Sequence, residues 1–342
     1  MGVQLADLFP GRPTTFGELS GRRMAIDAHN ALHQFLAIIR QPDGEPLRDS
    51  KGRTTSVYSG LFYRTARMLG EGIQPVYVFD GPPPRFKKLV IQRRAEVRVQ
   101  ARIRWEEALA EGDVKKARKY AQSALSLTQE MIANCKRLLT QMGLPYVSAP
   151  SEGEAQAAAM AARGDVWAAS SQDFDSLLFG SPRLVRNLTI SGRRKLPNKD
   201  VYTEISPLMV ELPEILNSLG IGQRELILLG LLVGTDYNEG GIAGIGPKRG
   251  LALVKGRETP EEVIESLDWD FDVDYNEIFD FFLHPPFSED YHIAFSPPDP
   301  GAIRDLLCAE FEFAEERVNK ALAQMKVAPK GKQTDLTAWA GS

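Results

Sequence analysis

Several aspartates and glutamates stand where short apolar runs end or where a helix would begin. The full set is Asp27, Asp80, Glu152, Glu154, Asp173, Asp175 and Asp236. Carboxylates within a few ångströms of one another repel and take up protons unless cations neutralise them. Oxygen ligands without His or Cys favour a hard cation such as Mg²⁺, for which Mn²⁺ could substitute. Two such ions about 4 Å apart can activate a water and stabilise the leaving oxygen of a phosphodiester. The residue types therefore indicate a two-metal hydrolytic site, provided that the fold makes the acids converge.

The stretch "SEGEAQAAAM", residues 151–160, also has a purely structural interpretation. Ser151 with Glu154 three residues later fits the capping-box pattern, and acids in a first helical turn suit the helix dipole. Glu152 and Glu154 would lie about 200° apart around a helix axis, yet at a first turn both can reach beyond the N-terminus. The pattern leaves a helix cap and a pair of metal ligands both open.

The elements that must position these acids follow from the apolar pattern. "RMAIDAHN", "IQPVYVFDG" and "DVWAASSQDFD" read as short strands that end in aspartates, and "SGLFYRTARMLGEG" and "TQEMIANCKRLLTQMG" read as helices between them. This alternation predicts an α/β fold with a central, mostly parallel sheet and helices on both faces. Ligands of such sheets gather at the carboxyl ends of the strands, which is where Asp27, Asp80, Asp173 and Asp175 would lie.

Composition and charge narrow the class of protein. The 342 residues are 43% apolar and carry a net charge of −4, with no apolar run long enough to cross a membrane. The N-terminus has no signal-peptide pattern, and the two cysteines suit a reducing compartment, so we expect an intracellular protein without a membrane partner. Charge is segregated: Arg85 to Tyr120 holds twelve basic and five acidic residues, a net +7, whereas Glu258 to Asp290 has many acids and no Lys or Arg. We expect one face for a polyanion and another that stays clear of it.

Three further segments differ from the alternating core. Residues 85–130 are densely charged helix formers with weak apolar periodicity, which predicts an exposed helical insertion. "GGIAGIGPKRGLALVK" is a glycine-rich turn before a helix that Pro247 can start at its first position. Residues 326–342 are polar with Pro and Gly and read as a flexible tail.

The motifs taken together resemble the flap endonucleases, archaeal-type members of the structure-specific 5′ nuclease superfamily. The resemblance rests on "AIDAHNALHQFL", "FYRTARML", "PVYVFDGPPP", "APSEGEAQAA", "SSQDFDSLLFG", "GTDYN" and "GIGPKR", in the family's order over nearly the whole chain. It implies one nuclease domain over residues 1–325 and Mg²⁺-dependent, two-metal hydrolysis at a junction between a single-stranded 5′ flap and duplex DNA, with 5′-3′ exonuclease activity besides. The family's metal carboxylates match the seven acids above, with Asp173 also counted as catalytic.

The resemblance assigns roles to the basic segment and to several contacts with DNA. Residues 85–130, the arch segment, would form a helical arch through which the flap passes, with Lys87 and Arg94 on the scissile phosphate. Residues from about 236 to 256 would form a helix–two-turn–helix element that binds a phosphate and a structural K⁺ ion. The implied DNA contacts are Gly2, His33, Arg40, Arg64, Gly244, Gly246, Lys248 and Arg249. His33 stands where relatives commonly place a tyrosine that stacks on a base, so we expect weaker positioning of the flap.

The tail resembles a peptide that binds a sliding clamp. Gln333, Leu336 and Trp339 are spaced as a one-turn helical plug within residues 333–340, while Ala340 replaces the second aromatic residue and weakens the expected binding. The expected partners are thus branched DNA and a PCNA-type clamp, and the expected state is a monomer in the cytoplasm or nucleoid of an archaeon. The implied roles are lagging-strand maturation and DNA repair.

Three other functions compete with this interpretation. A sibling nuclease of the superfamily would act on duplex ends, bubbles or four-way junctions, but the compact chain and the tail favour the flap enzyme. A non-catalytic adaptor for DNA junctions and the clamp has no use for a costly cluster of like charges. A phosphatase-type aspartate in "VFDG" lacks a second aspartate in the expected motif and leaves the basic segment unexplained.

Overall fold

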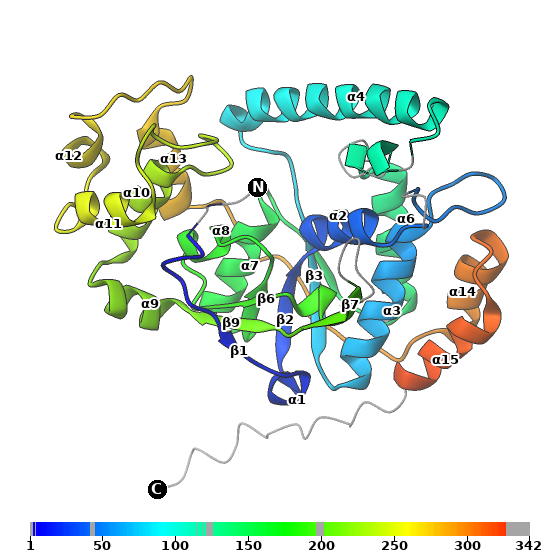
Figure 1. Ribbon diagram of the computed structural model, residues 1–342. Coiled ribbons are helices and arrows are strands. Elements are labelled where there is room, and N and C mark those ends of the chain that lie inside the picture. The colour runs from blue at the N-terminus through cyan, green and yellow to red at the C-terminus, as the bar shows by residue number, and fades with distance from the viewer. Residues whose placement is uncertain are drawn as a thin grey trace, which may run out of the picture.

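A twisted sheet of seven strands forms the centre of the computed structural model, which describes residues 3, 5–41, 45–113, 115–117, 119–120, 126–195 and 202–325 (Figure 1). The strand order in the described chain is β1-β9-β6-β5-β2-β3-β4. From β6 to β4 neighbouring strands run parallel, whereas β9 is antiparallel to both β6 and β1. The strands are β1 (Arg12–Pro13), β2 (Arg23–Asp27), β3 (Gln74–Phe79), β4 (Tyr146–Ser148), β5 (Ala168–Ser170), β6 (Arg183–Arg186) and β9 (Leu208–Glu211). The expected mostly parallel sheet is confirmed.

Side chains alternate between the two covered faces of the sheet. In β3, Tyr77 and Phe79 join the buried cluster that contains α2 (Ala28–Ile38), α3 (Ser56–Gly70) and α6 (Gln129–Gln141). Val76 and Val78, one residue out of phase, join the cluster on the other face with α7 (Gly153–Ala162). A period of two along a strand sends neighbouring side chains to opposite faces. Both faces are apolar because both are covered by helices, as parallel sheets require.

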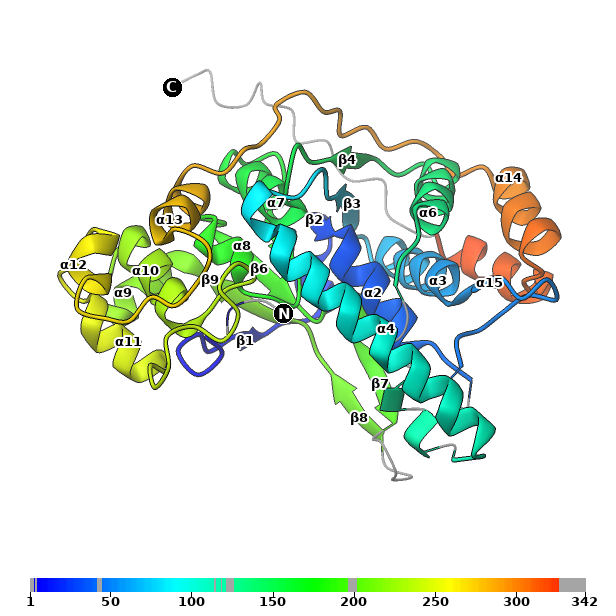
Figure 2. The same ribbon diagram turned by 90° about the horizontal axis from the view of Figure 1, so that it is seen from above.

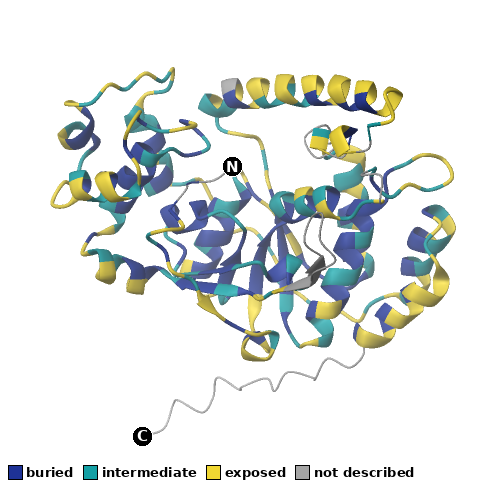
Figure 3. Cartoon of the chain, in the orientation of Figure 1, coloured by how far each residue is buried: buried dark blue, intermediate teal, exposed yellow. Residues whose placement is uncertain are grey.

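The arch segment begins with a short turn of 3₁₀ helix, η1 (Arg85–Lys87), and continues as α4 (Lys88–Ala110). This helix lies over the carboxyl edge of the sheet and crosses above α2, as Figures 1 and 2 show from two sides. Most of its surface is exposed (Figure 3), and only its far end forms a small core, where Trp105 and Ala108 pack with Ala117 and Tyr120. A helix with so little apolar surface is held by its ends and by its charges.

A second group of helices lies on one side of the sheet, at the left of Figure 1. It comprises α8 (Asp175–Leu178), α9 (Leu212–Leu219), α10 (Gln223–Val233), α11 (Pro247–Val254), α12 (Pro260–Ile264) and α13 (Tyr275–Leu283). The turn between α10 and α11 folds tightly on itself: Gly241 has φ of +61°, and a Cβ there would lie 2.3 Å from the carbonyl carbon of Val233. Glycine is therefore required at this position. As the sequence predicts, Pro247 is the first residue of α11.

The remaining elements complete the opposite end of the molecule. Helix α15 (Glu315–Met325) packs on α3, and its Val318, Ala321 and Leu322 are buried in the same core as α2. The elements not yet named are α1 (Phe16–Leu19), η2 (Leu188–Ile190), the hairpin of β7 (Gly192–Lys195) and β8 (Tyr202–Ile205), α14 (Pro300–Arg304) and the π-helical η3 (Asp305–Glu310). Within the described ranges, no single helix has the length and apolarity to cross a membrane, and α9 with α10 reaches them only as a pair bent by 82°.

Candidate active site

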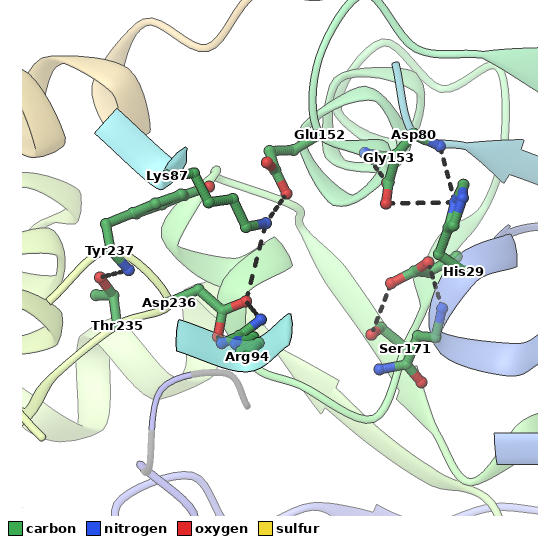
Figure 4. Close-up of polar contacts among 12 residues, drawn as sticks. His29, Asp80, Lys87, Arg94, Glu152, Gly153, Ser171, Thr235, Asp236 and Tyr237 are labelled. Carbon is green, nitrogen blue, oxygen red and sulfur yellow. Dashed lines mark hydrogen bonds and ion pairs between the residues drawn. The ribbon is translucent and has the colours of Figure 1, made fainter. Parts of the chain in front are cut away.

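The carboxyl ends of β2, β3 and β5 bring three of the predicted acids to one edge of the sheet. Figure 4 shows one of them, Asp80, beside Gly153 and His29. Asp27 is the last residue of β2 and caps α2, where its Oδ1 accepts a hydrogen bond from the backbone N of Asn30 at 3.0 Å. Asp80 directly follows β3, and its Oδ1 accepts from the backbone N of Gly153 at 2.7 Å. Asp173 lies in the loop after β5, where its Oδ2 accepts from Asn30 Nδ2 at 2.9 Å. The sheet topology therefore brings these three side chains to the carboxyl edge, where the sequence predicts them.

The two glutamates open α7, but not through the capping box that the sequence predicts. Glu152 is the N-cap residue and no side chain caps the helix, so the proposed pairing of Ser151 with Glu154 is wrong. The helix starts two residues after Ser151, which leaves Glu154 at its second residue instead of its third. Both carboxylates are thus released from capping. Glu152 accepts a hydrogen bond from Lys87, whereas Glu154 Oε1 is buried and has no hydrogen-bond partner within the described part of the chain.

The remaining two acids come from the helical side of the molecule. Asp175 is the first residue of α8, is buried, and accepts a hydrogen bond from the backbone N of Val3 at 2.8 Å. Asp236 lies in the turn after α10, which Asn238 fixes from within: Asn238 Oδ1 accepts from Thr235 N and Oγ1, and its Nδ2 donates to Leu231 O at 2.7 Å. A buried amide with three such hydrogen bonds restrains the loop around it, so Asp236 is presented from a well-anchored turn.

Repulsion among the acids shows in their pKa values. Burial, and then the negative charge of Asp80, raises the pKa of Asp27 well above its usual range. Burial and the charges of Asp175 and Asp27 do the same for the pKa of Glu154. Burial and the charge of Asp236 raise the pKa of Asp175 to about 7. These cross-effects mean that the acids share one field, in which a nearby cation would favour the ionised forms.

Two cations of the arch segment already reach into this field. Lys87 Nζ lies 2.7 Å from Glu152 Oε2 and 3.9 Å from Asp236 Oδ2. Arg94 donates Nη2 to Asp236 Oδ1 at 2.9 Å and Nη1 to Asp236 Oδ2 at 3.2 Å. Burial by itself would lower the pKa of Lys87, but the charges of Glu152 and Asp236 raise it above its ordinary value. Burial would likewise raise the pKa of Asp236, yet the hydrogen bonds from Arg94 lower it well below its ordinary value.

The acid set fits hard divalent cations by its chemistry. Its donors are all carboxylate oxygens, and the buried Glu154 Oε1 has no partner among the described residues. Burial and neighbouring negative charges also raise the pKa of several of these acids, and a bound cation would favour their ionised forms. In the part of the chain that the structure describes, no three Asp, Glu, His or Cys side chains are grouped closely enough to hold an ion as they stand. Lys87 and Arg94 occupy the carboxylates of Glu152 and Asp236, which would have to release them to bind a metal.

Three of the expected DNA contacts, His33, Arg40 and Arg64, lie on or just beyond helices α2 and α3. His33 is exposed on α2, and the positive charges of Arg98 and Arg94 reach its ring from the arch segment. Arg40 Nε donates to Ala37 O just beyond the end of α2. Arg64 on α3 donates to Ser191 O at 2.9 Å, next to the β7–β8 hairpin.

The helix–two-turn–helix candidates lie together at the turn between α10 and α11. Gly244 has φ of +75°, Gly246 caps α11, and Arg249 donates back to Gly244 O at 3.2 Å. Lys248 is exposed in the first turn of α11. Gly2 and the tail residues Gln333, Leu336 and Trp339 lie outside the described residues, so their roles stay predictions.

Several residues that support the site were not singled out from the sequence. Asn30 bonds both Asp27 and Asp173, and Ser171 Oγ donates to Asp27 Oδ2 at 3.4 Å. Gly153 holds Asp80 through its backbone. The spacing of Asn30 three residues after Asp27 was a usable signal, because it places the residue in the first turn that the aspartate caps. Nothing local marks Ser171 or Gly153 as neighbours of distant acids.

The chain is similar to known proteins over nearly its whole length. Residues 4–101 match the XPG N-terminal domain and residues 143–236 match the XPG I-region. The chain is 53% identical to flap endonuclease 1 of Pyrococcus abyssi over 340 residues, which cover 99% of this chain and 98% of the relative. The Korarchaeum cryptofilum flap endonuclease 1 is 51% identical over 327 residues, 95% of this chain and 96% of the relative.

The chain is also similar to solved structures. The flap endonuclease-1 from Methanococcus jannaschii matches with a TM-score of 0.76 and 41% identity, over 96% of this chain and 99% of that chain. The catalytic core of Rad2 in complex with DNA substrate shares the fold at 23% identity, with a TM-score of 0.69 over 95% of this chain. High identity over nearly the full length of both chains goes beyond a shared fold. The chain therefore belongs to the flap endonuclease family of XPG-type, structure-specific nucleases.

Proposed function

We propose that this protein is a structure-specific 5′ flap endonuclease that hydrolyses a DNA phosphodiester near the junction of single strand and duplex. Water adds to the phosphorus and the bond to the 3′ oxygen breaks, which leaves a 3′-hydroxyl and a 5′-phosphate. The observation that carries the proposal is the meeting of the acid set with Lys87 and Arg94 beneath a basic helix (Figure 4). Acids alone would repel a phosphate, whereas acids that bind cations, beside two fixed cationic side chains, attract it.

The chain's own residues divide the work between them. Asp27, Asp80, Glu152, Glu154, Asp173, Asp175 and Asp236 would hold the ions. Bound Mg²⁺ or Mn²⁺ would supply the Lewis acidity that polarises the phosphate and ionises a water. Lys87 presents a compact charge and Arg94 a planar fork, and either can donate to phosphate oxygens as negative charge grows on them. Both cations already lie at the acid set, so the phosphate enters between groups of opposite sign.

The rest of the molecule would bind the substrate. The helix–two-turn–helix region around Gly244, Gly246, Lys248 and Arg249 would hold the duplex through its phosphates, with K⁺ as a structural ion of the turn. The arch segment would guide the flap over the site. Such an enzyme works on DNA inside the cell, as replication and repair require.

The decisive experiment is cleavage of an end-labelled 5′-flap duplex by the purified protein in Mg²⁺ or EDTA, beside Asp173→Ala. We expect cutting in Mg²⁺, none in EDTA, and a rate at least about a thousandfold lower in the variant, because one ligand of a metal-bound transition state is lost. Equal cutting by wild type and variant would exclude the proposed site. A bubble and a four-way junction in the same panel distinguish a sibling nuclease, and tight junction binding without cutting would identify an adaptor.

We also propose that residues 333–340 bind a PCNA-type sliding clamp and that Ala340 weakens this contact. Ala340→Phe adds an aromatic ring that a clamp pocket can bury, and we expect it to tighten clamp binding by about tenfold or more. Calorimetric titration with the clamp measures this change. An unchanged affinity would show that position 340 does not enter the clamp.

A further inference from the structure

Arg94 is shared between two carboxylates that differ in their surroundings. Its Nη1 and Nη2 bond the two oxygens of Asp236, while Nε and Nη2 also bond Glu239 Oε1 at 3.0 and 2.8 Å. The Asp236 side chain is 18% exposed and lies among the acid set, whereas the Glu239 side chain is 43% exposed at its rim. Glu239 belongs to none of the motifs that assign a metal ligand. Of the two carboxylates that bind Arg94, Glu239 is therefore the one without an assigned role.

Asp236 cannot keep its bidentate contact with Arg94 and bind a divalent cation at the same time. Both of its oxygens accept from Arg94, so an ion that takes either oxygen must break part of the bidentate bond. Without a second acceptor, the guanidinium would then lose its anchor, and the first turns of α4 would lose one of the contacts that hold them. Glu239 supplies that acceptor through a single oxygen that faces Nε and Nη2 together.

Glu239 is well placed to keep this contact because its backbone is anchored. It follows Asn238, whose buried amide bonds Thr235 and Leu231. On the arch side, the ring of Phe86 packs edge-on against Tyr237 with centroids 5.1 Å apart and against Phe281 at 5.3 Å. The two ends of the Arg94–Glu239 contact are thus tied to the same well-anchored turn.

We propose that Glu239 is a positioning residue that retains Arg94 at the mouth of the site while Asp236 turns to the cations. Arg94 then has one carboxylate partner and free donor capacity, and it can grip an entering phosphate. The inference rests on the proposed function, because it assigns Glu239 a part in the same site. Glu239 is then needed when a cation and Arg94 compete for the carboxylate of Asp236.

The first experiment needs no substrate. Hydrogen–deuterium exchange of residues 88–98 is measured in wild type and Glu239→Gln, each with and without Mg²⁺. We expect Mg²⁺ to change exchange little in wild type but to raise it several-fold in the variant, since Arg94 then lacks both carboxylate partners. Glu289→Gln is the matched control, because Glu289 pairs with Arg163 far from the arch segment. Equal Mg²⁺ responses in wild type and Glu239→Gln would overturn the proposal.

The second experiment separates positioning from general destabilisation. Single-turnover cutting of the 5′ flap by Glu239→Gln should slow by about tenfold, with DNA affinity within about twofold of wild type and partial rescue by Glu239→Asp. In an Arg94→Ala background, Glu239→Gln should have no further effect, because both changes remove the same contact. An equal slowing in both backgrounds would show that Glu239 acts by another route. If wild type fails to cut any flap, the proposed function fails, and the exchange experiment alone decides the role of Glu239.

Discussion

At the scale of single residues, Gly153 shows how little space separates the elements of the site. Its backbone N donates to Asp80 Oδ1 at 2.7 Å, and a Cβ on Gly153 would lie 2.7 Å from the same oxygen and 3.2 Å from Val78 O. Real Cβ contacts are not this short, so a side chain here must move Asp80. The residue therefore serves the site by having no side chain.

Gly153→Ala should displace the Asp80 carboxylate and slow single-turnover flap cutting by about tenfold or more, because small displacements of a reacting group are costly. Gly17→Ala is the matched control, since a Cβ at Gly17 in α1 meets only Thr15 Oγ1 at 3.8 Å. Circular dichroism and thermal unfolding establish that both variants fold. A cutting rate within twofold of wild type would contradict this account of Gly153.

His33 gives the chain a pH dependence of stability that is separate from its catalysis. Partial desolvation beneath the arch segment, then the charges of His29 and Arg98, lower the pKa of His33 from 6.5 to about 4. Between these values the unfolded chain binds the proton and the folded chain does not, so stability present above pH 6.5 is lost as pH falls toward 4. We expect a loss on the order of 1 kcal/mol, less than the full shift would give, because the ring is exposed.

His33→Tyr keeps a ring that takes up no proton in this range. We therefore compare the urea midpoint of the variant with that of wild type at each pH. The variant's midpoint, minus the wild-type midpoint, should be larger at pH 5 than at pH 7. Urea unfolding at both pH values measures this. A gap between variant and wild type that does not change with pH would show that His33 titrates normally.

The residue types of the site could be predicted from the sequence, but the contacts of the site could not. Six of the seven acids are recognisable because they stand at a strand end or at the start of a helix, and in parallel α/β folds such positions share an edge. The seventh, Asp236, lies in the turn after an apolar helix. Lys87 and Arg94 entered through resemblance, and their partners Glu152 and Asp236 became visible only in three dimensions. Glu239 was not found, because an exposed glutamate in a turn has no local signature.

At the scale of elements, α7 illustrates why helix starts are hard to place. Ser151 and Glu154 have the spacing of a capping box, yet the helix begins at Gly153, where the backbone N bonds Asp80. A contact with a distant strand overrode a local preference that is worth only about 1 kcal/mol. The antiparallel edge of the sheet escaped prediction for a similar reason: β1 is the dipeptide Arg12–Pro13 and exists only through pairing with β9.

The α10–α11 element makes a prediction about affinity alone. Lys248 and Arg249 are at the start of α11, and phosphate contacts carry no base information. Replacing both by Ala should weaken binding to duplex of any sequence and reduce the slope of log affinity against log salt by about 2. Fluorescence anisotropy over a KCl series measures the slope, with Lys255→Ala beyond the end of α11 as the control. An unchanged slope would remove these residues from the DNA interface.

At the scale of the whole molecule, charge is paired across elements that are distant in the sequence. The acidic stretch from Glu258 to Asp290 is expected to stay clear of a polyanion, and part of it contacts the start of the arch segment. Arg85 lies 2.7 Å from Glu277, and Arg93 lies 3.8 Å from Asp272. These exposed pairs contribute little stability by themselves. They indicate instead that the acidic stretch also balances the base of the arch.

Cation binding should stabilise the whole fold, since the acids repel one another in its absence. At a hundredfold excess of Mg²⁺ over its dissociation constant, the free energy of unfolding should rise by about 3 kcal/mol. Asp27→Asn removes one buried charge at nearly constant shape, so the Mg²⁺ effect should shrink while the metal-free protein becomes no less stable. Differential scanning calorimetry with Mg²⁺ and with EDTA checks both. The same Mg²⁺ effect in wild type and variant would exclude Asp27 as a ligand.

The packing of Phe86 against Tyr237 and Phe281 fixes the start of the arch segment beside the acids, so α4 can tilt about this point. Lys87 is next to Phe86 in the chain, while α4 extends 23 residues beyond this point, about 34 Å at the rise of an α-helix. A tilt of about 10° would then swing the far end by roughly 6 Å while Lys87 stays almost in place, by the geometry of a rigid helix. The proposed passage of a strand would therefore need only the distal end of α4 to move, and Lys87 would stay almost in place beside the acids.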